Sequence, residues 1–284
     1  METELVKQNM YNIGFIGGGN MSTAIAKGIL RNESYSASQI WVSGPHIDHL
    51  KHWEEMGANV TDKNGEVLSK CDVVFLGVKP GVLSYAVGDC LKSLPTDGPR
   101  KDFFFVSMLA GVTIENLHKA FKVFDFPTSV IRIMPNTPMS VGAGICLYTP
   151  DNIVKPEQCM LLEKILSSCG ICEKVAEPLM NSGGVLPACG PAFMYIVIEA
   201  LADGAVKQGV PRAMAMHWAA QVLVGSGEMV LQSKKHPGLL KDEVCSPGGS
   251  TICGVTALEN GRLRATLINA IEAATLRTYE MGKK

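Results

Sequence analysis

The chain has 284 residues, of which 46% are hydrophobic and 19% charged, and its formal net charge is −1. This length favours two domains, each able to bury a core without disulfides or metal. The near-neutral charge, with no cluster of Lys and Arg, argues against an electrostatic nucleic-acid binder.

The first half of the sequence alternates short apolar runs with amphipathic segments. The first two helices that this pattern predicts are Met21 to Arg31 and Ile47 to Met56. The predicted strands are the runs YNIGFIG, QIWVSG, ANVT, DVVFLGV, FFFVSML, SVIRIMPN and GICLYT. Continuous apolar strands separated by helices indicate a parallel sheet covered on both faces. We therefore expect an α/β fold with a Rossmann-type, doubly wound parallel sheet.

After about Pro150 the strand signals fade, and the predicted domains are residues 1–165 and residues 166–284. A last short strand, CEKVAEP, is followed by segments with helical spacing. The predicted helix from Pro191 to Gly209 begins with proline and ends with glycine, as helices commonly do. The other predicted helices are Pro211 to Gln232 and Gly254 to Met281, the latter broken near ENGR. The second domain is therefore expected to be all-helical.

The helices of this second domain carry apolar residues on several faces. A single layer of three or four helices cannot bury them all. A homodimer formed through this domain would cover the excess, whereas the alternative is a compact bundle packed on the first domain. We expect the homodimer.

Nine cysteines without a framework spacing indicate free thiols in a reducing compartment. Cys169 and Cys172 form a C-x-x-C, which suits a redox pair or half of a zinc site as well as two structural thiols. No second pair accompanies it, so we interpret the thiols as structural and expect no metal. The N-terminal METELVKQNMYN resembles no targeting segment, and the apolar stretch Phe193 to Ile198 is too short to span a membrane. The sequence therefore predicts a soluble, cytoplasmic protein.

The clearest chemical signal is the segment IGFIGGGNMSTAI, in which Gly17-x-Gly19-x-x-Ser22 joins the first strand to the first helix. Gly17 permits a sharp turn, and Gly19 lets the backbone approach a pyrophosphate closely. The N–H groups of the helix N-terminus favour an anion there. This placement in a βαβ unit predicts a dinucleotide site more strongly than a purely structural glycine turn.

The end of the second strand bears on which dinucleotide binds. NAD sites usually carry Asp or Glu there, which bonds the ribose 2′-hydroxyl. This chain reads Ser43, Gly44, Pro45, His46, with no carboxylate, and Ser43 and His46 could donate to a 2′-phosphate. The absence of a carboxylate favours NADP(H). NAD(H) stays possible, because the segment Ser43 to His46 has no arginine that would bind a 2′-phosphate.

Two further segments end strands at the edge where cofactors bind, VKP at Val78 to Pro80 and MLAGV at Met108 to Val112. Lys79 could contact a phosphate, ribose or amide oxygen there. It could equally be a surface lysine whose stem lies along the protein.

The segment DEVCSPGGSTICGV, Asp242 to Val255, places a proline, two adjacent glycines and hydroxyl residues between helices. The glycines have no side chains that would keep a ligand from the backbone, and the N–H groups of the following helix suit a carboxylate. A capped turn would use the same residues. Local chemistry leaves both interpretations open.

Five segments, in this order, resemble the pyrroline-5-carboxylate reductase family: IGFIGGGNM, FLGVKP, RIMPNTP, GPAF…EALADGAVKQGVPR and HPGLLKDEVCSPGGSTICGV. The resemblance covers the chain from Ile13 to about Arg277. It implies NAD(P)H-dependent reduction of L-1-pyrroline-5-carboxylate to L-proline, the last step of proline biosynthesis. It also implies an intertwined dimer through the helical domain, with dimers assembling into a decamer, and an active site between the two domains.

The resemblance also implies roles for particular residues. The residues that it assigns to the cofactor are Ile16, Gly17, Gly18, Gly19, Asn20, Met21, Ser43, Gly44, Pro45, Asn64, Val78, Lys79, Pro80 and Ala110. Those that it assigns to the substrate are Glu177, Glu243, Ser246, Gly248, Gly249, Ser250 and Thr251. Thr251 is the residue expected to hydrogen-bond the ring nitrogen, and so the candidate catalytic residue.

The chain departs from the family pattern at two places. LPACGPAF, from Leu186 to Phe193, stands where relatives commonly read LSGSGPAY, which puts a role for that segment in doubt. Glu243 stands where relatives often carry asparagine, and a carboxylate beside an anionic substrate needs an explanation.

Two other functions are compatible with the cofactor fingerprint. A related imine or β-hydroxyacid reductase is one, although the latter needs a catalytic lysine early in the second domain and the helix from Pro191 offers only Lys207, near its end. A non-catalytic NADP(H) sensor is the other. Turnover of pyrroline-5-carboxylate separates these functions.

Overall fold

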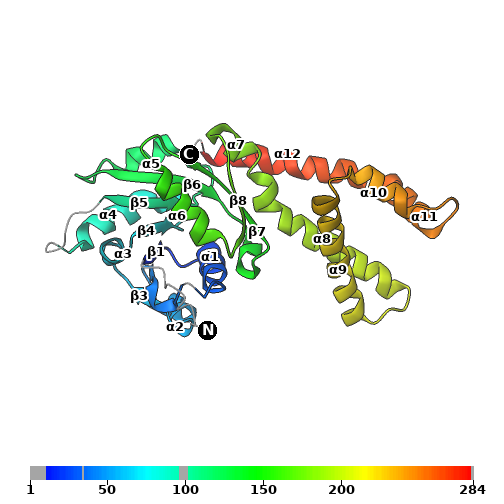
Figure 1. Ribbon diagram of the computed structural model, residues 1–284, viewed down its shortest axis with the longest axis horizontal. Helices are drawn as coiled ribbons and strands as arrows, with labels where there is room; N and C mark the ends of the chain where they lie inside the picture. Colours follow the sequence, from blue (N-terminus) through cyan, green and yellow to red (C-terminus); the bar gives the residue numbers. More distant parts are fainter. Residues whose placement is uncertain (1–10, 34, 96–101, 283–284) are drawn as a thin grey trace, which may run out of the picture. The chain divides into compact units, whose positions relative to one another are not determined.

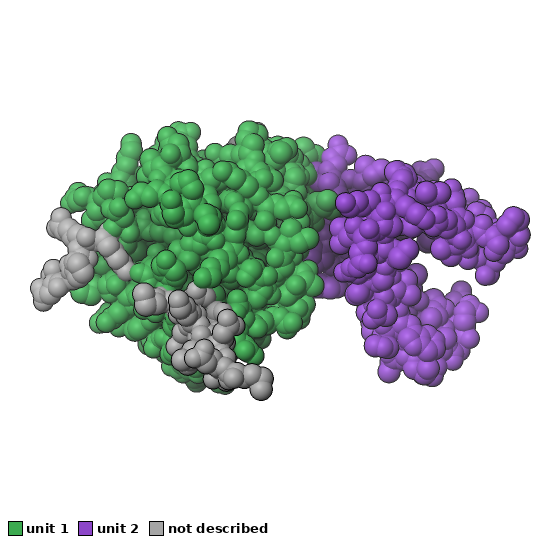
Figure 2. Space-filling model, viewed as in Figure 1, with its two compact units in different colours: residues 1–188, 275–284 green, residues 189–274 purple. Residues whose placement is uncertain are grey.

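A computed structural model describes residues 11–33, 35–95 and 102–282 of the chain. The chain separates into two compact units, which Figure 2 colours differently. Unit 1 comprises Met1–Ala188 and Thr275–Lys284, and unit 2 comprises Cys189–Ala274. The domain boundary at residue 165 stays a prediction; the last strand of the sheet in unit 1, Gly170–Lys174, lies beyond it.

The described part of unit 1 contains an eight-stranded sheet with the order β3-β2-β1-β4-β5-β6-β7-β8 (Figure 1). The strands are β1 Ile13–Ile16, β2 Ile40–Ser43, β3 Asn59–Thr61, β4 Val73–Leu76, β5 Phe103–Ser107, β6 Thr128–Met134, β7 Gly144–Pro150 and β8 Gly170–Lys174. The Rossmann-type fold class is thereby confirmed. The chain order reverses direction between β1 and β4, which is where ligands bind in open α/β sheets.

One pair of strands departs from the predicted parallel arrangement: β6 and β7 are antiparallel. Only nine residues separate Met134 from Gly144, and Thr137–Val141 among them form a single 3-10 helix. A parallel return would need a crossover of a dozen residues or more. The prediction of an all-parallel sheet is therefore wrong at this one connection.

Helices cover both faces of the sheet (Figure 1). One buried cluster joins the sheet to α1 (Asn20–Leu30), α2 (Lys51–Glu55) and α6 (Pro156–Leu166). A second joins it to α3 (Asn64–Lys70), α4 (Leu83–Ser93) and α5 (Ile114–Phe121). The central strands β1, β4, β5 and β6 are buried on both faces, which explains why their sequences read as continuous apolar runs, whereas the edge strands β3 and β8 are partly exposed.

The remaining helices follow the sheet in the chain. They are α7 Glu177–Ser182, α8 Val185–Lys207, α9 Arg212–Ser233, α10 Pro237–Val244, α11 Ser250–Asn260 and α12 Leu263–Gly282. The break predicted near ENGR is confirmed between α11 and α12, where Arg262 has a φ of 54°. The helical region predicted after the sheet is likewise confirmed, since the chain from Glu177 to Gly282 forms only helices and their connections.

The predicted start of α8 at Pro191 is wrong, because the helix begins six residues earlier and contains this proline. Proline has no N–H, so the carbonyl of Pro187, four residues before it, loses its helical partner. The side-chain amide of Asn136 donates to that carbonyl at 3.1 Å. This hydrogen bond replaces the missing helical one and lets α8 continue through Pro191, although proline usually stands at the start of a helix.

Replacing Asn136 with alanine should lower the free energy of unfolding by about 2 to 4 kcal/mol, because a buried carbonyl and a partly buried N–H lose their partner. Besides donating to Pro187, Asn136 accepts the N–H of Ile145 through Oδ1 at 3.0 Å. Chemical denaturation measures the change. Asn152→Ala, at an exposed position, is the control and should stay within about 0.5 kcal/mol; equal losses in the two variants would contradict this role.

Unit 2 buries little of its apolar surface. Its buried hydrophobic cluster consists of Ala202, Ala215 and Ala219, all small. The large apolar side chains that α8 and α9 expose include Tyr195, Ile196, Leu201, Met214, Met216, Trp218, Val222, Val224, Met229, Val230 and Leu231. Exposed apolar surface of this extent marks an interaction site.

Candidate active site

The turn between β1 and α1 has the geometry that its glycines require. Gly17 has a φ of 98°, which L side chains rarely adopt, and its N–H donates to the carbonyl of Ser43 at 2.9 Å. A Cβ at this position would lie 2.8 Å from the carbonyl oxygen of Gly77. The buried hydroxyl of Ser22 donates to the Gly17 carbonyl at 2.5 Å. Serine at the third fingerprint position therefore fixes the turn as well as allowing close packing.

Gly19 differs from Gly17 because nothing in the protein crowds it. It is the N-cap residue of α1, and a Cβ built there would have no atom within 4 Å. The N–H groups of the first turn of α1, which begins at Asn20, have no partners within the helix. This open surface with free donors is the shape that a pyrophosphate needs.

A cavity of about 360 Å³ lies beside this turn, at the carboxyl ends of the strands. It brings together seven of the residues predicted to bind the cofactor: Ile16, Gly17, Ser43, Gly44, Pro45, Asn64 and Val78. The other predicted residues, Gly18, Gly19, Asn20, Met21, Lys79, Pro80 and Ala110, do not line it. Lys79 is exposed, and Ala110 lies in the loop between β5 and α5.

Five lining residues were missed by the sequence reasoning: Asp62, Val82, Tyr85, Ala86 and Asp89. Four of them recur at the i, i+3, i+4, i+7 spacing, which places them on one face of the helical segment after VKP. That spacing, next to a strand end already predicted to be at the cofactor edge, was the available signal. No sequence pattern marked Asp62 as a lining residue, because only the pairing of β2 with β3 brings it to the cavity.

The hydroxyl of Ser43 is not available to a 2′-phosphate as the sequence reasoning proposed. Ser43 is fully buried, and its Oγ donates to Oδ1 of Asn64 at 2.7 Å. The amide of Asn64 in turn donates to the carbonyl of Ala86 at 3.1 Å. These bonds hold the ends of β2, α3 and α4 together around the cavity.

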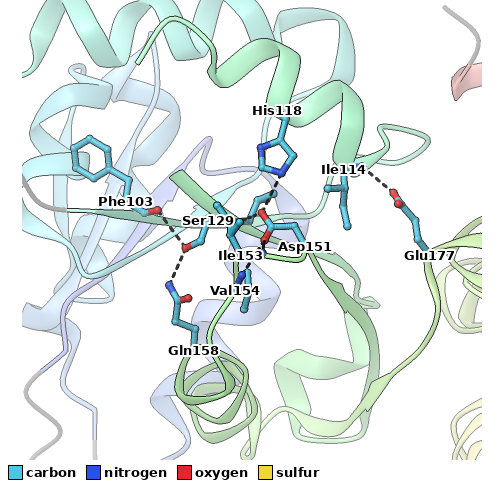
Figure 3. A network of polar contacts seen from close by, with 10 residues as sticks. Phe103, Ile114, His118, Ser129, Asp151, Ile153, Val154, Gln158 and Glu177 are labelled. Atoms are coloured by element: carbon cyan, nitrogen blue, oxygen red, sulfur yellow. Dashed lines mark hydrogen bonds and ion pairs between the residues drawn. The ribbon is translucent and has the colours of Figure 1, made fainter. Parts of the chain in front are cut away.

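Glu177, a predicted substrate residue, lies in unit 1 on α7 and contacts two other elements; Figure 3 shows its contact with Ile114. Its Oε1 accepts the N–H of Ile114 at 2.8 Å and lies 3.5 Å from Nη1 of Arg132. Burial lowers the pKa of the Arg132 guanidinium, and the carboxylate of Glu177 opposes that shift. The carboxylate thus ties α7 to β6 and to the start of α5, four residues after Ala110.

The segment Ser246 to Thr251 lies in unit 2 and runs from the connection after α10 into the first turn of α11. Gly248 has a φ of 68°, and the N–H of Gly249 closes a turn by donating to the carbonyl of Ser246 at 3.1 Å. Gly249 is the N-cap residue of α11, so Ser250 and Thr251 occupy the first turn. Their N–H groups have no helical acceptor. The loop therefore presents free N–H donors, as an anion site requires.

The hydroxyl of Thr251 is free to bind a ligand. This half-buried side chain makes no hydrogen bond to any described residue. Thr256, on the same helix, instead donates from Oγ1 to the carbonyl of Ile252 at 2.9 Å. Of the two threonines, Thr251 is the one placed to act on a bound molecule.

The charge of Glu243, on α10, is offset by Lys235, which precedes this helix. Its Oε1 accepts from Nζ of Lys235 at 2.7 Å. This ion pair explains how a carboxylate can stand near a loop that suits an anion. Glu243 also borders an apolar groove of about 590 Å³ between α9 and α10.

The C-x-x-C shows no sign of redox activity at its first cysteine. Cys169 is fully buried, and burial raises the pKa of its thiol to about 12. A thiol of this kind is not a nucleophile near neutral pH. Within the described ranges, no group of three His, Cys, Asp or Glu side chains is placed to hold a metal ion.

Two family models match the chain. The one described as pyrroline-5-carboxylate reductase dimerisation matches residues 177–281. The one described as NADP oxidoreductase, coenzyme F420-dependent, matches residues 12–111. The chain is 40% identical to pyrroline-5-carboxylate reductase 2 of Bos taurus over 95% of this chain and 83% of that one. The chain belongs to the pyrroline-5-carboxylate reductase family.

Other members of the pyrroline-5-carboxylate reductase family match over nearly their whole length. The Escherichia coli enzyme is 38% identical over 95% of this chain and 98% of its own. The crystal structure of Plasmodium falciparum pyrroline carboxylate reductase with NADP bound has a TM-score of 0.83 and 30% identity, covering 96% of this chain and 98% of that one. The enzyme of Coxiella burnetii has a TM-score of 0.81 and 32% identity. The resemblance found in the sequence is thereby confirmed.

Proposed function

We propose that this chain reduces L-1-pyrroline-5-carboxylate to L-proline with NADPH as the favoured hydride donor, the last step of proline biosynthesis. The observation that carries the proposal is the loop Ser246 to Thr251, which combines free N–H donors with a free hydroxyl. The cavity beside Gly17 supports cofactor binding, as does the NADP bound to the Plasmodium relative. Family membership over 95% of the chain supports the reaction.

The residues of the loop suit the two polar groups of the substrate. The N–H groups at the start of α11 would bind the carboxylate, and Oγ of Thr251 would hydrogen-bond the ring nitrogen. The cyclic imine is substantially protonated near neutral pH, and an iminium carbon accepts hydride without a strong general acid. The bound nicotinamide supplies that hydride. The protein contributes mainly orientation, which accounts for much of the rate in such reactions.

The predicted site residues are retained in this proposal. Those proposed to contact the cofactor are Ile16 to Met21, Ser43 to Pro45, Asn64, Val78 to Pro80 and Ala110, with Ser43 shaping the cavity wall and not donating its hydroxyl, which is bonded to Asn64. Those proposed to act on the substrate side are Glu177, Glu243, Ser246, Gly248, Gly249, Ser250 and Thr251. Glu177 is proposed to have a second role. Its hydrogen bond to the start of α5 orders the loop that carries Ala110.

We infer a homodimer through unit 2, and assembly of dimers into a decamer. The large apolar side chains exposed on α8 and α9 support the dimer, as does the family model for dimerisation. The segment Glu177–Lys207 is long and apolar enough to cross a membrane by length and composition. It also contains Glu199 and Asp203 and lies within the match to the dimerisation model, so a second subunit is its proposed cover. Burial of this segment in a dimer would make the enzyme soluble, and we propose that it acts in the cytoplasm, as the sequence predicts.

The test is the oxidation of NADPH when L-1-pyrroline-5-carboxylate is added to the purified chain. We expect L-proline to form in equal amount to the NADPH consumed. Tight NADPH binding without turnover would overturn the proposal in favour of a cofactor sensor. Turnover of other cyclic imines but not of this one would favour a related imine reductase.

A further inference from the structure

The cavity beside Gly17 has an acidic lining. Its lining residues include Asp62 and Asp89 and neither lysine nor arginine. The two carboxylates differ in their contacts. Oδ2 of Asp89 accepts the N–H of Asn64 at 3.0 Å, whereas the exposed side chain of Asp62 has no hydrogen-bond or ion-pair partner among the described residues. Asp62 is therefore the acidic group free to meet a bound nucleotide.

The sheet places Asp62 beside the end of β2. Ser43 at the end of β2 pairs with Thr61 at the end of β3, and the N–H of Gly44 donates to the carbonyl of Thr61 at 3.2 Å. Asp62 follows Thr61 as Gly44 follows Ser43. In dinucleotide-binding domains the acidic residue that bonds the ribose 2′-hydroxyl stands at the end of β2. Here the neighbouring strand brings a carboxylate to the same place.

We propose that Asp62 is a specificity-determining residue that faces the ribose 2′ position and narrows the preference for NADPH over NADH. Its carboxylate accepts a hydrogen bond from the 2′-hydroxyl of NADH and repels the 2′-phosphate of NADPH. The Ser43 hydroxyl is bonded to Asn64, and no lysine or arginine lines the cavity, so the repulsion is offset only in part, by groups beside the cavity such as the exposed His46. This inference rests on the proposed function only in that both place a dinucleotide in this cavity.

Binding of cofactor fragments tests the proposal without relying on the reaction. The dissociation constants of adenosine 2′,5′-bisphosphate and of 5′-AMP are measured by calorimetry for the unmodified chain and for Asp62→Asn. Asparagine keeps the size of the side chain and removes its charge. The preference for the bisphosphate should rise by roughly 5- to 15-fold in the variant, as expected for one nearby charge in a partly solvated site. The increase should shrink at high ionic strength.

The matched control is Asp125→Asn, an exposed aspartate in the same unit that does not line the cavity. It removes the same charge and should leave the preference unchanged. A preference in Asp62→Asn within twofold of the unmodified chain, or an equal rise in both variants, overturns the proposal.

The ratio of kcat/KM for NADPH to that for NADH, measured with pyrroline-5-carboxylate, should rise with the binding preference. If the chain lacks that activity while Asp62→Asn still shifts fragment binding, the proposed reaction fails and the role of Asp62 stands. If the activity is present but neither ratio changes, the role of Asp62 fails and the reaction stands.

Discussion

Replacing Gly19 with alanine should lower kcat/KM for NADPH by about 100-fold, because a methyl group at this position displaces the pyrophosphate from the start of α1. The protein itself has room for the change. The φ of −73° and ψ of −177° at Gly19 are accessible to alanine, and its Cβ would meet no atom within 4 Å. The free energy of unfolding should therefore change by less than about 1 kcal/mol.

Steady-state kinetics with varied NADPH, together with chemical denaturation, distinguishes loss of binding from loss of fold. Gly88→Ala is the matched control, since a Cβ there also meets nothing within 4 Å and Gly88 does not line the cavity. It should leave the kinetics unchanged. A Gly19→Ala variant with unaltered KM for NADPH and unaltered kcat would contradict the assignment of the pyrophosphate to this turn.

Replacing Thr251 with alanine should lower kcat/KM for pyrroline-5-carboxylate by roughly 10- to 100-fold, equivalent to about 1.4 to 2.7 kcal/mol. The variant loses the hydroxyl proposed to bond the ring nitrogen. NADPH binding should not change, because the fingerprint turn and its cavity lie in unit 1 and Thr251 lies in unit 2.

Two further variants show whether this effect belongs to the Thr251 hydroxyl. Thr251→Ser keeps the hydroxyl and should retain most of the activity. Thr256→Ala removes a hydroxyl from the same helix that is bonded to the backbone at Ile252, and it should leave kcat/KM unchanged. If Thr251→Ala is as active as the unmodified chain and equally stable, Thr251 has no part in the reaction.

The predictions that held rest on local patterns with a single physical cause. Gly17 is a clear example, since the turn after a buried strand needs a positive φ and the sequence offers glycine there. The central strands were predicted correctly because burial on both faces makes each of them an uninterrupted apolar run. The helix α9 was likewise predictable, because Pro211 stands at its start and a long segment without a further proline follows.

The predictions that failed, and the missed cavity residue Asp62, depended on partners distant in the sequence. Pro191 reads as a helix start, and only the amide of Asn136, fifty-five residues away along the chain, allows α8 to pass through it. Ser43 reads as a donor to a phosphate until Asn64 is seen to accept its hydrogen bond. Asp62 reads as a loop residue until β2 and β3 pair. In each case the controlling contact is made by the tertiary fold, and no local pattern encodes it.

The most direct test of the proposed reaction follows the hydride itself. NADPH that carries deuterium at the transferable position of the nicotinamide C4 is supplied with L-1-pyrroline-5-carboxylate, and the product is analysed by NMR. The proposal predicts L-proline with one deuterium at C5. This ring carbon was the imine carbon of the substrate; it is bonded to nitrogen and does not carry the carboxylate. L-Proline without deuterium, or no L-proline despite full NADPH binding, would contradict it.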